Sequence, residues 1–220
     1  MKKRVLHILA LLMVVAVAFS FAGCNRNGFD ASLYVKGILD VTYKDDSTDY
    51  LKMVDDTADN AHEMYLSGLD TEAEYFASVY SIETLSDETR QAIVSMYQEI
   101  YQHSNYEVKS ANVTDSGYTV EVLIRPIDIF IKTADSVEAY IDEFNERNMA
   151  GEFADMTDEE FEDEYAKGLL EICNDYIPNI GYMDEQSIVV KVTLDESSHL
   201  WTLSDQDFSN IDELIIDYNF

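Results

Sequence analysis

Strict alternation in one short segment constrains the fold of this chain more than any other feature. Within residues 106–126, YEVKSANVTDSGYTVEVLIRP, apolar side chains occupy every second position from 118 to 124. A period of two places one row of side chains on a buried face of a β-strand. Residues 114–117 before this strand are typical turn residues, and Pro126 after it cannot donate to a strand ladder. The segment therefore predicts a β-hairpin.

A second alternating segment lies far downstream, at residues 187–194. It is followed by the turn residues 195–198 and by a short segment, 199–203, in which Trp201 is the expected anchor. Two hairpins of this kind predict a four-stranded antiparallel sheet.

Helical periodicity fills the segments around the hairpins, with N-cap residues where each helix is expected to begin. A capping box at residues 157–160 marks one start. The other expected starts are Asp30, Asp49, residues 55–57, Ser86, Asp135 and Ser204. The order of elements predicts an α+β fold in which helices cover one side of the sheet. Two helices at about 135–178 are expected to form an antiparallel pair inserted between the hairpins.

The net charge of −30 limits the classes of partner. The first 23 residues hold three of the 14 basic side chains and no acidic one. The rest of the chain therefore has 11 basic and 44 acidic residues, a net charge of −33. Such a surface repels nucleic acid and anionic membranes, so attachment to a membrane must be covalent or apolar. A hydrophobic content of 47% argues against disorder, and one domain over residues 30–220 is expected.

The N-terminus predicts export and lipid attachment. Residues 1–23 combine a basic start with an apolar run and small residues, the pattern of a signal peptide. Their end, Phe21-Ala22-Gly23-Cys24, resembles the lipobox of bacterial lipoproteins, with Phe at the place where Leu is usual. The resemblance implies that the Cys24 thiol carries a diacylglycerol and that residues 24–29 form a tether. A plain transmembrane anchor is the alternative, because the apolar run is marginally long enough.

Three longer segments also resemble a known group of proteins. They are DASLYVKGILDVTYKDD (30–46), VTDSGYTVEVLIRPIDIF (113–130) and HLWTLSDQDFSNIDELI (199–215). They are similar to uncharacterised lipoproteins of Gram-positive bacteria whose extracellular part has an NTF2-like, or cystatin-like, fold. The resemblance covers most of residues 29–217. It implies the fold and a location on the outer face of the cell membrane, and no particular activity.

Candidate catalytic and metal-binding residues form no recognisable motif. The acidic runs 55–60 and 158–164 lack the Gly and the spacing of a calcium loop, so solvated acids are the preferred interpretation. After His62-Glu63, the second histidine of a zinc-protease helix would fall at Leu66. Of the other histidines, His7 lies in the expected signal peptide, and His103 and His199 stand far apart in the sequence. We therefore expect no catalytic residue, cofactor or metal, although folding could still join a distant His–Asp pair.

One cysteine and an excess of tyrosine remain. Cys173 lies on an apolar helical stripe, where a buried, inert thiol is the preferred interpretation over an exposed, reactive one. The 15 tyrosines fall mostly on inward stripes, which favours packing in the core. A tyrosine-lined cavity for an apolar or sugar-like ligand is the alternative.

These observations favour a lipid-anchored binding or interaction module of the cell envelope, without enzymatic activity. Its acidic surface would favour cationic partners such as basic protein surfaces. The alternative is a carrier or enzyme that binds a small molecule between the sheet and the helices. An inward-facing pair of ionisable groups with perturbed pKa values would favour that alternative, and a filled interior would favour the interaction module.

Overall fold

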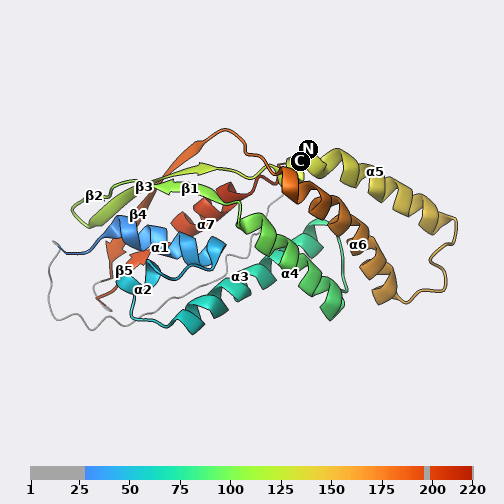
Figure 1. Cartoon of the computed structure of the whole chain (residues 1–220), viewed down its shortest axis with the longest axis horizontal. Helices are drawn as coiled ribbons and strands as arrows, with labels where there is room; N and C mark the ends of the chain where they lie inside the picture. The colour runs from blue at the N-terminus through green and yellow to red at the C-terminus, as the bar shows by residue number, and fades with distance from the viewer. Residues whose placement is uncertain (1–27, 196–198, 220) are drawn as a thin grey trace.

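An antiparallel β-sheet with one covered face is the centre of the fold (Figure 1). The computed structural model describes residues 28–195 and 199–219, so the predicted signal peptide, Cys24 and part of the last turn lie outside the described residues. The strands are β1 (Asn105–Val108), β2 (Asn112–Val113), β3 (Gly117–Arg125), β4 (Gln186–Leu194) and β5 (Trp201–Leu203). Their order is β1-β3-β4-β5, with β2 also paired to β3. The predicted α+β class and antiparallel sheet are confirmed, but the described sheet has five strands where four were predicted.

The first arm of the central hairpin is divided into β1 and β2, whereas the sequence suggested one arm. Both strands pair with β3 on the same edge, through Glu107 opposite Leu123 and Asn112 opposite Thr119. Between them, the backbone N–H of Ala111 donates to Ser32 Oγ at 2.8 Å instead of joining the ladder. A contact with a helix therefore interrupts the strand.

Seven α-helices appear in the described residues. They are α1 (Ala31–Lys44), α2 (Tyr50–Met53), α3 (Ala58–Val79), α4 (Asp87–Tyr101), α5 (Ile129–Met149), α6 (Asp158–Tyr176) and α7 (Asp205–Ile215). Side-chain caps occur at five predicted starts, because each cap accepts a backbone N–H that the first turn leaves unpaired. The five caps are Asp30, Thr57, Ser86, Thr157 with its capping box, and Ser204.

The prediction that a helix begins at Asp135 is wrong, because α5 begins six residues earlier. Ile127 forms β-bridges with Tyr182 and Ile216, so the chain leaves the sheet directly into the helix. The Asp128 carboxylate accepts the backbone N–H of Gly181 at 2.9 Å instead of capping α5. Long-range contacts thus decide where this helix starts.

One face of the sheet forms the core. The alternating residues of β3 are buried there, together with Val190 and Val192 of β4. Helices α1 and α7 pack against the sheet, and α1 also packs against α3. Helix α1 is therefore enclosed on more than one side, with Val35 and Leu39 fully buried. On the opposite face of the sheet, Val189 remains 57% exposed.

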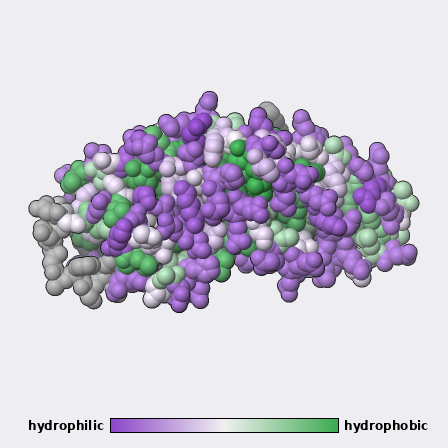
Figure 2. Space-filling view, in the orientation of Figure 1, coloured by the Kyte–Doolittle hydropathy of each residue, from purple (hydrophilic) through white to green (hydrophobic). Residues whose placement is uncertain are grey.

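Helices α3–α6 extend the molecule away from the sheet. Helix α4 packs on α3 and α6, and α6 packs on α5. The α5–α6 pair lies at the opposite end of the long axis from β2 and β5 (Figure 1). Aromatic rings join the pair, since Phe144 of α5 lies 5.1 Å from Tyr165 and 5.2 Å from Phe161 between ring centroids. Hydrophilic residues cover most of the face shown in Figure 2, as the high content of acidic residues requires.

Candidate functional site: a buried tyrosine–carboxylate cluster

Two half-buried acidic side chains of distant helices lie in one region of the fold. Glu72 belongs to α3 and Asp212 to α7. Tyr101 Oη donates to Glu72 Oε1 at 2.6 Å, and Tyr218 Oη donates to Glu72 Oε2 at 3.3 Å. Tyr43 Oη donates to Asp212 Oδ1 at 2.8 Å. We call these five residues the tyrosine–carboxylate cluster.

The aromatic rings of the cluster also contact one another. Tyr43 and Tyr101 lie edge to face, with ring centroids 5.2 Å apart. The hydroxyl groups of Tyr218 and Tyr97 are 3.2 Å apart, which connects a further buried tyrosine. Such rings contribute apolar area to the core, while their hydroxyls need polar partners. The carboxylates supply those partners, which explains how a core can hold so many tyrosines.

Burial perturbs the ionisation of both acids. Burial raises the pKa of Glu72 to about 7, with a further increase from the nearby charge of Asp212, although hydrogen bonds from Tyr101 and Tyr218 oppose it. Burial likewise raises the pKa of Asp212, against the hydrogen bond from Tyr43. Two acids in one buried region resist ionising together, and their titrations are coupled.

The tyrosines remain protonated over the same pH range. Burial raises the pKa of Tyr43, Tyr101 and Tyr218 well above the ordinary value of 10.0, and the nearby carboxylates raise it further. Their hydroxyls therefore stay hydrogen-bond donors, and Glu72, with its pKa of about 7, is the cluster member that gains or loses a proton near neutral pH.

A carboxyl group that titrates near neutrality can serve as a general acid or base. Chemistry also requires space for a substrate, and the depression beside the cluster leaves no room for a water-sized molecule. It is lined by Phe76, Val79, Tyr80, Tyr97, Phe130 and Tyr218. This arrangement can store a proton inside the fold, but the depression itself offers no place for a ligand.

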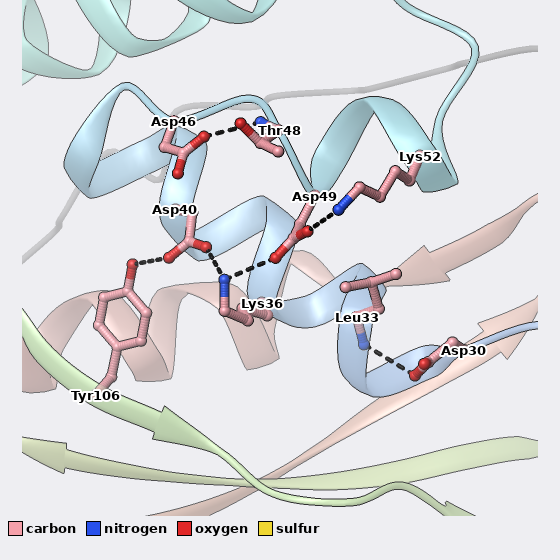
Figure 3. A network of polar contacts seen from close by, with 9 residues as sticks. All are labelled: Asp30, Leu33, Lys36, Asp40, Asp46, Thr48, Asp49, Lys52 and Tyr106. Atoms are coloured by element: carbon pink, nitrogen blue, oxygen red, sulfur yellow. Dashed lines mark hydrogen bonds and ion pairs between the residues drawn. The ribbon is translucent and has the colours of Figure 1, made fainter.

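A second polar network surrounds Lys36 of α1 (Figure 3). Lys36 Nζ forms ion pairs with Asp40 and, at 2.7 Å, with Asp49 Oδ2, while Lys52 Nζ lies 2.7 Å from Asp49 Oδ1. Tyr106 Oη of β1 donates to Asp40 Oδ1 at 2.7 Å. Hydrogen bonds from Lys36 and Lys52 lower the pKa of Asp49 to about 2. The network joins α1 to α2 and β1, and Asp40 and Asp49 are both paired with lysines.

Folding brings His62 to Asp45, the kind of pair that the sequence left open. His62 Nδ1 lies 2.8 Å from Asp45 Oδ2, with both side chains exposed. The other two histidines of the described residues are in other parts of the fold: the carbonyl of His103 accepts a hydrogen bond from Tyr182 Oη, and His199 adopts a left-handed backbone conformation. The His62–Asp45 pair is a surface contact that joins the end of α1 to α3.

The acidic run at the start of α6 binds backbone amides as well as facing solvent. Glu162 Oε2 accepts the N–H groups of Glu83 and Thr84, and Asp163 Oδ1 accepts that of Ser86. These bonds hold the segment that leads into α4. In the described part of the chain, no group of three or more acidic, cysteine or histidine residues could hold a metal ion.

The prediction that Cys173 is buried is confirmed. Burial raises the pKa of its thiol to about 12, against a hydrogen bond with Thr133. Because the thiolate is the reactive form, we expect the folded protein to leave Cys173 unlabelled by maleimide at pH 7. Mass spectrometry of a Cys24→Ala chain should show one label after unfolding in urea and none before. Rapid labelling of the folded chain would contradict the buried position.

The cluster itself was not apparent from the sequence. The tyrosine excess indicated an aromatic core but did not identify carboxylate partners. Glu72 is one step before buried Ala73 and three after buried Leu69, and Asp212 follows buried Ile211. An acid beside an apolar helical stripe, in a chain rich in tyrosine, is the signal that could have identified each one. Nothing local indicates that the two meet.

Comparison with known proteins gives one structural relative. No protein-family model and no curated protein matches the chain. A solved structure of YcdA, a candidate lipoprotein of Bacillus subtilis subsp. subtilis strain 168, matches with a TM-score of 0.57 at 15% identity. The match covers 86% of this chain and 56% of that protein, so the chain spans about half of the relative's length. At this identity the likeness shows a shared fold. In the described residues no helix is long and apolar enough to span a bilayer.

Proposed function

We propose that the chain is a lipid-anchored protein on the outer face of a bacterial membrane, attached through Cys24. The observation that carries the proposal is the position of Gly23-Cys24, where the apolar run ends and a short polar tether begins. The fold shared with YcdA, itself a candidate lipoprotein, supports it. We further propose that the sheet with one helix-covered face is of the NTF2-like type.

The folded part acts as a non-catalytic interaction module in this proposal. The hydroxyls and carboxylates of the tyrosine–carboxylate cluster are partnered with one another, and the depression beside them is filled by side chains. An acidic exterior favours partners with basic surfaces, because complementary charge increases the rate of encounter. The proposed partner is therefore a cationic component of the envelope.

A second candidate function is a carrier or enzyme for a small molecule. The pKa of Glu72, raised to about 7, is the observation that favours it. This function requires the aromatic residues beside the cluster to move apart. A ligand that binds the wild type and fails to bind a folded Glu72→Gln variant would support it over the interaction module.

Replacing Cys24 tests the anchor. In a Gram-positive host fed a labelled fatty acid, the wild type should carry the label and sediment with membranes. The Cys24→Ala chain should lose the label entirely, because the thiol is the acceptor. Cys173→Ala is the matched control and should keep it, since that thiol is buried. Equal labelling of the wild type and Cys24→Ala would refute the anchor.

A further inference from the structure

At one end of the sheet, apolar side chains on its core-facing side extend beyond the helices that cover that face. Tyr118 pairs with Val113 on one side and with Val192 on the other, and Leu194 pairs with Trp201. Directly opposed residues of antiparallel strands project from the same face, and every second residue repeats that face. Val113, Leu194 and Trp201 therefore lie on the same face as buried Tyr118.

The residue that precedes α1 completes this group. The ring of Phe29 stacks on Trp201 with centroids 4.8 Å apart and lies 5.9 Å from the ring of Tyr118. Val113 is 74% exposed and Leu194 36%, and Trp201 is half-buried. We call Phe29, Val113, Tyr118, Leu194 and Trp201 the sheet tip. It combines aromatic residues with exposed aliphatic ones at the point where the described chain begins.

The length of the tether determines what can cover the sheet tip. Five Cα–Cα steps separate Cys24 from Phe29, and even a fully extended chain spans at most about 18 Å over them. If Cys24 carries the lipid of the proposed function, on which this inference rests, the bilayer surface lies within that distance of Phe29. Trp and Tyr favour the membrane–water interface, where the ring is amphipathic.

We propose that the sheet tip rests on the lipid surface, and that the α5–α6 pair points away from the membrane. Figure 1 places β2 and β5 at one end of the long axis and this helical pair at the other. The occupant is the interfacial region of the bilayer that holds the anchor. Asp115 and Asp195 lie at the hairpin turns at this end, and their negative charges are repelled by anionic lipid headgroups. The contact with the membrane therefore depends on the apolar and aromatic groups of the sheet tip, and anionic lipid weakens it.

Fluorescence of Trp201 tests the orientation directly, since it is the single tryptophan of the chain. A chain that begins at Cys24 keeps every described element, and its Cys24 thiol can be coupled to a maleimide lipid in phosphatidylcholine vesicles. Buried Cys173 does not compete for the coupling. Replacing the lipids by ones brominated near the headgroup should reduce Trp201 fluorescence at least twofold. Adding anionic lipid should weaken this quenching.

A reporter at the other end is the matched control. Met149, at the end of α5, is 81% exposed, so Met149→Trp combined with Trp201→Phe should preserve the fold. Its fluorescence should be unchanged by the brominated lipids. A Val113→Asp/Leu194→Asp variant with unchanged circular dichroism should lose most of the Trp201 quenching.

The possible outcomes test the proposed lipid-facing surface independently of the proposed lipid anchor. Equal or stronger quenching of the Met149→Trp reporter, or no quenching of Trp201, would overturn the proposed orientation. Quenching of Trp201 in the chemically coupled chain supports the lipid-facing surface even where cells fail to lipidate Cys24. In that case the proposed anchor would fail while the surface stands.

Discussion

At pH 8 the Glu72→Gln variant should resist urea better than the wild type by about 3 kcal/mol, whereas at pH 4 the two should unfold alike. The pKa of Glu72 is raised from 4.5 to about 7 in the folded state, chiefly by burial. Between these values the folded protein holds a proton that the unfolded chain has released. The stability of the wild type therefore falls as pH rises through this window.

Each unit of pKa difference corresponds to about 1.4 kcal/mol, which sets the size of the effect. Glutamine keeps the shape of the neutral acid and can still accept the hydroxyl of Tyr101. The variant should therefore not lose stability as the pH rises. Its stability advantage over the wild type should develop between pH 4.5 and 7 and then level off. Nearby Asp212, whose pKa is also raised, should make the stability of both proteins fall further as the pH rises.

Urea unfolding at several pH values measures this difference. Glu63→Gln, which replaces an exposed acid on the same helix, is the control and should change stability only slightly. If Glu72→Gln were less stable than the wild type at pH 8, the carboxylate would be a net stabilising group. The buried-proton account of the tyrosine–carboxylate cluster would then be wrong.

Replacing Gly37 by alanine should destabilise the fold by about 2 kcal/mol or more. A Cβ on Gly37 would lie 2.6 Å from the backbone N and 2.8 Å from the Cα of Tyr50. These are backbone atoms of α2, and Tyr50 is fully buried, so the neighbour cannot move aside cheaply. Overpacking at such a site costs about 1–3 kcal/mol, more than alanine contributes to helix propensity.

Gly68 offers a matched control because it also lies inside a helix, α3. A Cβ there meets nothing within 4 Å, so Gly68→Ala should stabilise the protein by up to about 1 kcal/mol. Thermal unfolding of both variants and of the wild type measures the two changes in stability. If Gly37→Ala gained stability as Gly68→Ala does, the close approach of α1 and α2 would be disproved.

Local chemistry determined much of the secondary structure. The caps at Asp30, Thr57, Ser86, Thr157 and Ser204 were predictable, because each side chain bonds an amide only three residues away. Alternation in β3 and β4 was equally informative, since a strand with one covered face requires a period of two. These features depend on neighbours in the sequence. The pattern at Cys24 is also local and lies outside the described residues.

Only the tertiary structure decided the remaining features. Helix α5 begins at Ile129 because Asp128 binds Gly181, and the first arm of the hairpin breaks because Ala111 binds Ser32. Glu72 and Asp212 meet although 140 positions separate them, and their pKa values depend on that meeting. Burial and charge act through space, so a one-dimensional pattern shows that the core is rich in tyrosine but not which acids its hydroxyls bind.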